Sequence, residues 1–194
     1  MTDLKIKHTT LHRLVDYSNH LKNLNDVDKH ARFGYIAKDF AIDQMALHMA
    51  YNPKIHELWY ARVDGEIAGW GHLANIKDTT WELAVSVEED HQRKGVGDAL
   101  IKTMLAWAKF HNITEVFMHC IEKNRVIQHL ASKNSLEIRA RDSGEWTSSI
   151  TLPKPTIFET NSQLWREQTE ILREFNVLKN RMMNLWSSTI HQVQ

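Results

Sequence analysis

Cysteine, net charge and long apolar runs are all scarce in this sequence. Its 194 residues include one cysteine, Cys120, so an intramolecular disulfide is excluded and a reducing cytoplasm is the expected setting. The first residues lack the apolar core of a signal peptide, and no stretch approaches the ~18 to 20 apolar residues that span a bilayer. Lysine plus arginine equal aspartate plus glutamate at 24 each, and this balance argues against a nucleic-acid-binding protein.

The sequence gives no support for a metal site either. Histidines number 12, and His8 and His12 stand four residues apart. However, the HExxH pattern is absent, and no Cys/His cluster has the spacing of metal ligands. We therefore expect scattered surface and partly buried histidines, and no bound metal.

The hydrophobic pattern predicts an α/β or α+β domain over residues 1–155. Hydrophobic residues make up 42% and charged residues 25%, the range of a soluble globular protein. Apolar periodicity predicts helices at 11–24, 26–33 (with Asp26 as N-cap), 38–51, 95–110 and 123–133, and strands at 5–9, 56–63, 66–74, 80–87, 114–120, 136–140 and 145–152. Asp64-Gly65 is typical of a hairpin turn. This order of elements predicts a mixed sheet with helices on its faces.

Residues 156–194 form a separate segment, because Pro153 and Pro155 interrupt the chain before it. Thr160 and Gln163 fit a capping box at the start of an amphipathic helix. The apolar residues that follow form a heptad-like seam: Leu164, Ile171, Phe175, Leu178, Met182 and Leu185. An apolar stripe of this width needs a partner. Two alternatives stay open, a helix packed on its own domain and a helix that joins two copies into a homodimer.

The most specific motif lies between the strand that ends at Val87 and the helix that follows. It consists of Gln92, Arg93, Lys94, Gly95, Val96 and Gly97. Glycines allow a tight turn and a close approach of the backbone to a ligand, and the free amides at a helix N-terminus attract an anion. The motif is neither GxxxxGK[ST] nor GxGxxG. It predicts a binding site for a phosphate-rich ligand.

Around this turn the sequence resembles the GNAT family of N-acetyltransferases. The resemblance is carried by strand residues 82–87, the turn 92–97, helix residues 99–101 and Asn124 after the next strand. Arg32-Phe33 is similar to an Arg-Phe pair in the branch that includes bacterial protein-lysine acetyltransferases. The family fold implies a mixed, largely antiparallel sheet whose fourth and fifth strands splay apart.

The resemblance also implies acetyl-CoA as co-substrate and assigns a role to each motif residue. The pantetheine arm would pair with the main chain of Val85 and Val87 in the gap between the splayed strands. The pyrophosphate would lie on the turn 92–97, and the Asn124 side chain would contact the cofactor. Asp98 would oppose the pyrophosphate unless its carboxylate points away.

Acetyl transfer requires a neutral amine, because a lysine-like ammonium with a reference pKa near ~10.4 must first lose a proton. Glutamate at this place in the fourth strand is similar to the general base of the lysine-acetylating branch, so we predict that Glu82 is the catalytic base. The alternative is a glutamate that faces solvent, with a water chain or a group from the N-terminal helices as base. Glu88 is expected in a solvated turn.

The sequence departs from the family at the general acid for the leaving thiolate. Many members carry a tyrosine seven residues after the asparagine, where this chain has Ala131, and Ser135-Leu136 replaces the usual glycine-phenylalanine pair. Two functions therefore compete: an N-acetyltransferase acting on a small amine or a protein lysine, and a catalytically idle acyl-CoA-binding sensor or assembly module. Acetylation of aminoacyl-tRNA is disfavoured by the zero net charge and the missing tyrosine.

Overall fold

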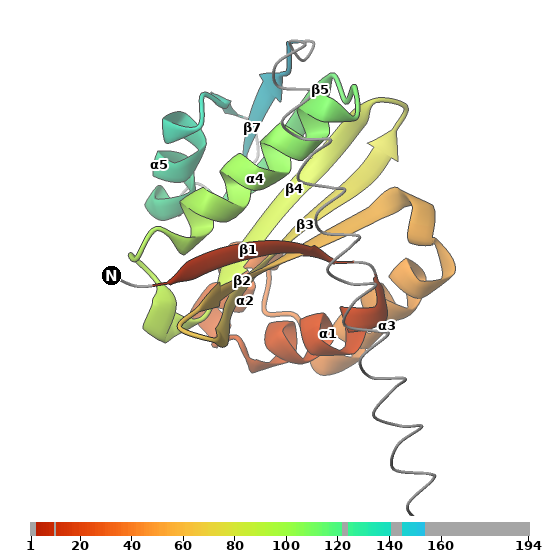
Figure 1. Cartoon of the computed structure of the whole chain (residues 1–194), viewed down its shortest axis with the longest axis vertical. Coiled ribbons are helices and arrows are strands. Elements are labelled where there is room, and N and C mark those ends of the chain that lie inside the picture. Colours follow the sequence, from red (N-terminus) through yellow and green to blue (C-terminus); the bar gives the residue numbers. More distant parts are fainter. Residues whose placement is uncertain (1–2, 10, 122–123, 141–144, 154–194) are drawn as a thin grey trace, which may run out of the picture. The chain divides into compact units, whose positions relative to one another are not determined.

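The described part of the chain is built on a mixed β-sheet of seven strands (Figure 1). The computed structural model describes residues 3–9, 11–121, 124–140 and 145–153. The sheet order is β1-β2-β3-β4-β5-β7-β6. The strands are β1 (Leu4–Thr9), β2 (His56–Val63), β3 (Glu66–Lys77), β4 (Thr80–Val87), β5 (Glu115–Ile121), β6 (Glu137–Ala140) and β7 (Glu145–Thr151). Neighbours are antiparallel except β4 and β5, which run parallel. The predicted mixed, largely antiparallel α/β sheet is confirmed.

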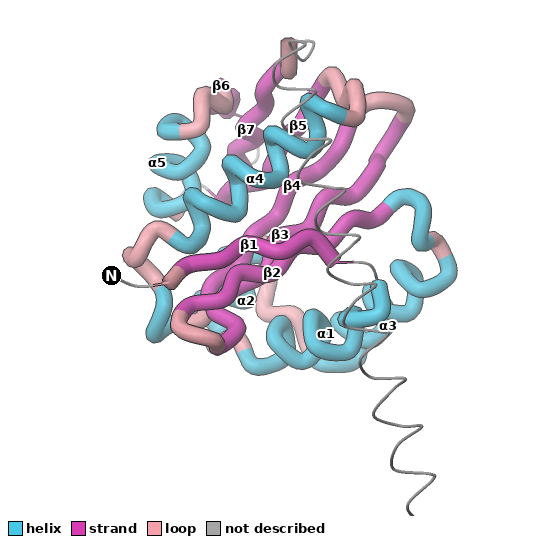
Figure 2. The backbone as a smooth tube through the Cα atoms, viewed as in Figure 1, coloured by secondary structure: helices cyan, strands magenta, loops and turns pink. Residues whose placement is uncertain are grey.

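Helices cover both faces of this sheet (Figure 2). They are α1 (Leu14–Asn23), α2 (Asp26–Phe33), α3 (Asp39–Tyr51), α4 (Val96–Phe110) and α5 (Arg125–Lys133), and short 3₁₀ turns lie at Leu11–Arg13, Pro53–Ile55 and Glu89–His91. The predicted cap of α2 is wrong by one residue. Asn25, not Asp26, is the N-cap, and its Oδ1 accepts a hydrogen bond of 2.8 Å from the Asp28 amide. Asn25 has the extended backbone conformation of an N-cap residue, whereas Asp26 is already the first residue of the helix.

Two hydrophobic cores hold these helices on opposite faces. On one face, α4 buries Leu100, Ile101 and Met104 with Leu83 of β4. On the other face, α1 and α3 bury a cluster that comprises Tyr17, Leu21, Leu24, Ala37, Ile42, Met49, Leu58, Tyr60 and Trp70. Because side chains alternate along a strand, Val85 and Val87 pack toward α4 with Leu83, and Ser86 faces α1. Strand β4 therefore presents one row of side chains to each layer.

Strands β4 and β5 splay apart beyond their first residues. Their parallel pairing covers three positions, of which the last joins Glu82 to Phe117. Farther along β4, the Glu88 amide donates to the Ala68 carbonyl of β3 at 2.9 Å. Main-chain groups of alternate residues point the same way, so those of Val85 and Val87 face away from β3 and into the gap. The splayed geometry that the family resemblance implies is present.

The chain divides into two compact units, Met1–Lys154 and Pro155–Gln194. The predicted helical seam of residues 157–194 lies outside the described residues. Among the residues that are described, none of the helices combines the length and apolar character needed to cross a membrane.

Candidate active site

A cleft of about 1260 Å³ opens where β4 ends, between α2 and α5. Most of the predicted site residues line it: Val85, Val87, Gln92, Arg93, Gly95, Val96, Gly97 and Asn124. Lys94 and Glu82 are not part of this lining. Helix α2 supplies the opposite wall, which includes Asp28 and Arg32. The cleft thus gathers segments that are separated by about a hundred residues in sequence, from α2 to α5.

The turn before α4 presents free main-chain amides to the cleft. Gly95 has a φ of 82° and Arg93 a φ of 59°, so two left-handed residues curl the chain into the helix. No side chain caps the N-terminus of α4, and the Ala99 amide makes the first helical hydrogen bond, to the Gly95 carbonyl. The amides ahead of Ala99 point out of the helix, where its dipole carries partial positive charge. Such a concave turn binds anions.

The side chain of Gln92 braces this turn. Its Nε2 donates to the Val87 carbonyl at 3.2 Å and to Asp28 Oδ2 at 3.0 Å. One amide thereby links the end of β4, the turn and helix α2. The Val87 carbonyl is available to Gln92 because it faces the gap rather than β3. Gln92 therefore holds the wall of the cleft in place.

Gly97 and Asn124 shape the side of the cleft that α5 forms. A Cβ on Gly97 would lie 3.3 Å from Leu130 Cδ1 and 3.7 Å from Val87 Cγ2, so glycine allows α4 to approach both neighbours. Asn124 is the N-cap of α5, and its Oδ1 accepts from the Ile127 amide at 3.1 Å. The sequence suggests a contact of Asn124 with the cofactor, and this capping role is not predicted from it. The signal that could have shown it is the position of Asn124 directly before the apolar helical pattern.

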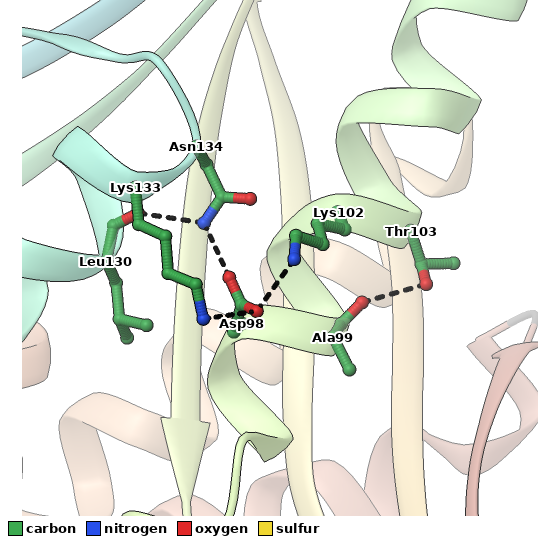
Figure 3. Close-up of polar contacts among 7 residues, drawn as sticks. All are labelled: Asp98, Ala99, Lys102, Thr103, Leu130, Lys133 and Asn134. Carbon is green, nitrogen blue, oxygen red and sulfur yellow. Dashed lines mark hydrogen bonds and ion pairs between the residues drawn. The ribbon is translucent and has the colours of Figure 1, made fainter.

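Asp98 is part of the cleft lining, and its carboxylate points toward Lys133 and Asn134 at the end of α5 (Figure 3). Its oxygens accept from Asn134 at 2.9 Å and lie 2.9 Å and 3.0 Å from the ammonium groups of Lys102 and Lys133. Burial alone raises the pKa of Asp98, but the hydrogen bonds from Lys102, Asn134 and Lys133 outweigh it and lower the pKa to about 2. The carboxylate is therefore ionised and neutralised by two lysines, which removes its conflict with a bound pyrophosphate.

Arg32 brings a cationic group from α2 to the cleft. Its guanidinium lies 5.1 Å from the centre of the Phe33 ring, and one of its nitrogens donates to the Tyr17 hydroxyl at 3.3 Å. Arg93 lines the cleft from the opposite side. Two guanidinium groups at one cleft suit a ligand with several phosphates.

Glu82 lies on the face of the sheet that α1 and α3 cover. Its neighbours Trp81 and Leu83 both pack on the α4 side, so the Glu82 side chain points to the other face. It is half-buried, and no hydrogen bond or ion pair joins its carboxylate to another described residue. Its position at the last β4–β5 pair places it where the splay begins.

A second acidic residue, Glu88, lies in the turn directly after β4, as expected, and its side chain is partly exposed. Its carboxylate also accepts a hydrogen bond of 2.6 Å from Nδ1 of the buried His20. The other nitrogen of His20, Nε2, lies 2.8 Å from Ser86 Oγ. The hydrogen bond from His20, aided by the charges of His20 and His91 and opposed by burial, lowers the pKa of Glu88. The sequence does not reveal this cluster, because His20 lies 66 residues from Ser86 and 68 from Glu88.

A pair of buried histidines lies deeper on the same face. His56 Nδ1 and His72 Nε2 are 3.1 Å apart. Burial, followed by the charge of Arg32 and then that of His56, lowers the pKa of His72 well below its ordinary value. Burial and the charge of His48 likewise lower the pKa of His56. Both rings are therefore neutral at neutral pH. No group of three or more histidine, cysteine, aspartate or glutamate residues in the described part of the chain is arranged to hold a metal ion.

The family model of the acetyltransferase (GNAT) family matches residues 24–134. The chain belongs to this family, and it is an acyl-CoA-dependent N-acyltransferase of the GNAT type. The match covers α2, the splayed strands, the glycine turn and α5, which are the elements that build the cleft. A comparison with curated proteins finds no match.

Solved structures of the same fold include enzymes with bound cofactor. Spermidine N-acetyltransferase from Vibrio cholerae, in complex with CoA and spermine, has a TM-score of 0.60 at 13% identity over 76% of this chain and 95% of that one. The Salmonella typhimurium protein yncA, with its cofactor acetyl-CoA, has a TM-score of 0.59 at 13% identity over 79% and 96%. The GNAT domain of S. lividans PAT has a TM-score of 0.63 at 16% identity over 77% and 90%. At 13–16% identity, the likeness to these three structures shows the fold alone.

Proposed function

We propose that this protein transfers an acetyl group from acetyl-CoA to an amine by direct attack of the amine on the thioester. The cleft at the end of β4 is the observation that carries the proposal. It combines uncapped helix amides, two arginines and an unpaired strand edge, which suit a pyrophosphate and an extended amide-containing arm. The pyrophosphate would lie on residues 92–97, the arm along Val85 and Val87, and Asn124 beside it.

We propose Glu82 as the base that takes the first proton from the incoming ammonium. Its carboxylate lies on the α1–α3 face, at the point where the β4–β5 gap begins. An arm that runs from the glycine turn along β4 would bring the thioester toward this point. Lack of a competing partner among the described residues leaves the carboxylate available to an amine.

The acceptor belongs to one of two amine classes, a small polyamine or a protein lysine. Similar folds are known in a spermidine N-acetyltransferase and in the GNAT domain of S. lividans PAT. The acceptor chemistry common to both classes is a primary ammonium on a flexible aliphatic chain.

An acetylation assay on the full-length protein tests the proposal. Acetyl-CoA is offered with spermidine, spermine and a lysine-containing peptide, and thiol release is followed over time. We expect turnover with at least one amine, at a rate within the range of about 1 to 10³ s⁻¹ that is usual for enzymes. A trimethyl-lysine peptide is the matched control, because it has no N–H to replace. Calorimetric binding of acetyl-CoA without any turnover would contradict the proposal and support the idle sensor, whose main support is that Ala131, in place of a tyrosine, is fully buried.

We further propose a homodimer formed through residues 156–194, and a cytoplasmic setting. The heptad-like seam supports the dimer, and the single cysteine supports the setting. Light scattering on the full chain and on a chain that ends at Pro155 tests the dimer. We expect twice the monomer mass for the full chain and a monomer for the shortened one. A monomeric full chain at micromolar concentration would contradict the dimer.

A further inference from the structure

Three side chains form a continuous hydrogen-bonded line that leads from the partly exposed Glu88 through the buried His20 to the cleft. Glu88 Oε1 lies 2.6 Å from His20 Nδ1, and His20 Nε2 lies 2.8 Å from Ser86 Oγ. The His20 side chain is only 3% exposed, so it reaches solvent through its partners. Of the three residues, Ser86 is the one that lines the cleft.

The partners of His20 fix the direction of these hydrogen bonds. An ionised carboxylate only accepts hydrogen bonds, so Nδ1 of His20 carries a hydrogen and donates it to Glu88. In the neutral imidazole Nε2 is then unprotonated and accepts from the Ser86 hydroxyl. Glu88 is ionised at neutral pH because its hydrogen bond from His20 lowers its pKa. The order acid, imidazole, hydroxyl is that of the serine catalytic triad, in which the imidazole takes the proton of the serine hydroxyl and later returns it to a leaving group.

Glu88 is the charged side chain that is hydrogen-bonded to His20, and the other charged or titratable groups nearby have other partners or are neutral. On β3, His72 is neutral, since burial lowers its pKa. On α2, Arg32 is directed to Tyr17, and on α3, Asp43 pairs with Lys22 of α1. His91, beyond β4, contributes to the lowered pKa of Glu88. Glu88 is therefore the carboxylate that is in direct hydrogen-bond contact with His20.

Ser86 lines the cleft beside the path proposed for the pantetheine arm. It lies between Val85 and Val87, whose main-chain groups face the gap proposed for the pantetheine arm. Its hydroxyl keeps its lone pairs while its hydrogen is held by His20. A proton from a group in the cleft can therefore pass to Ser86 Oγ as the hydroxyl proton passes to His20 Nε2.

We propose that Glu88, His20 and Ser86 form a proton relay for the acyl-transfer step, an inference that rests on the proposed function. As the C–N bond forms, the attacking nitrogen becomes positively charged and must lose its remaining extra proton. Ser86 Oγ takes this proton and gives its own to His20 Nε2. The C–S bond then breaks, and His20 returns the proton through Ser86 to the departing thiolate. The first proton of the ammonium goes to Glu82 and from there to water, so the products are the amide, CoA thiol and one proton.

The relay also supplies a proton donor in place of the tyrosine that is missing at position 131. Ala131 offers no proton and is fully buried. A thiolate leaves more readily when a group near it supplies a proton. The structure brings that group from α1 and β4 instead, through a side chain that the chemistry of acetyl-CoA binding does not otherwise use.

Two substitutions that keep the side-chain volume nearly unchanged test the relay in the full-length enzyme. We expect Ser86→Ala and His20→Gln each to lower kcat by about 10²-fold or more, the usual scale of proton-transfer catalysis. Acetyl-CoA affinity, measured by calorimetry, should stay as in wild type. Ser86→Thr keeps a hydroxyl and should retain most of the rate. The double variant of Ser86→Ala and His20→Gln should be no slower than the slower single variant, because each substitution alone already interrupts the same relay.

Ser18→Ala is the matched control. Ser18 is a buried serine of α1, 6% exposed, whose hydroxyl lies 3.5 Å from Asp43 Oδ1, and it is not part of the cleft lining. Its loss should leave kcat unchanged.

The outcomes separate the relay from the proposed function. Full activity in Ser86→Ala or His20→Gln overturns the relay and leaves the acetyltransferase standing. Loss of activity in Ser86→Thr equal to that in Ser86→Ala also overturns it. A wild-type protein that binds acetyl-CoA and acetylates no amine overturns the proposed function and the relay together.

Discussion

Replacing Gly95 with leucine is expected to abolish acetyl-CoA binding while the domain remains folded. Gly95 precedes α4 at a φ of 82°, and a Cβ there would meet nothing within 4 Å. The new side chain would therefore project into open space beside the uncapped amides rather than into the core. It would cover the anion-binding turn and cost about 1–2 kcal/mol in backbone strain. Isothermal titration calorimetry measures the binding, and thermal unfolding measures the strain.

Gly65→Leu is the control, because it introduces similar backbone strain at a glycine that does not line the cleft. Gly65 lies in the hairpin turn between β2 and β3, has a φ of 96° and also meets nothing within 4 Å. Both variants should therefore lose a similar amount of stability. Only Gly95→Leu should lose acetyl-CoA. Wild-type affinity in Gly95→Leu would exclude the turn as the pyrophosphate site, and loss of binding in both variants would attribute the effect to the fold.

Most helices and strands of this fold can be predicted from the sequence, because apolar periodicity and turn residues within a few positions determine them. The alternation of Leu83, Val85 and Val87 predicts β4, and Asp64-Gly65 predicts the hairpin before it. The glycine turn combines a left-handed residue with a helix start, and both features are visible over six residues of sequence. The exact start of a helix is harder to predict where two neighbouring residues can both act as N-cap. At α2 both Asn25 and Asp26 can do so, and the structure has Asn25 as the cap.

The polar interactions of the cleft could not be predicted because their partners are far apart in sequence. Gln92 meets Asp28 across 64 residues, and Asn134 meets Asp98 across 36. Nothing in the local pattern distinguishes His20 from the other polar residues of its helix. The packing of α1 against the sheet, which is driven by Tyr17 and Leu21, places it beside Ser86 and Glu88. Apolar periodicity thus fixes which faces meet, and the polar pairs follow from the tertiary structure.

Glu82→Gln is expected to lower kcat at neutral pH by about 10²- to 10⁴-fold, the scale of general-base catalysis. Glutamine has nearly the same shape and cannot take a proton. Because the Glu82 side chain faces away from the α4 core and lies outside the cleft lining, acetyl-CoA affinity should change little. Steady-state kinetics and calorimetry on the same preparation measure the two effects. Glu66→Gln, an exposed glutamate at the start of β3, is the control and should retain the wild-type rate.

The pH dependence of this variant identifies the step that Glu82 serves. A primary ammonium loses its proton unaided as the pH approaches its reference pKa of about 10.4, so the acceptor then arrives neutral. The rate of Glu82→Gln should therefore approach that of wild type as the pH rises. His20→Gln should show no such recovery, because its defect lies after the attack. A rate within a few-fold of wild type at neutral pH would exclude Glu82 as the base and assign the first proton to a water chain or to the N-terminal helices.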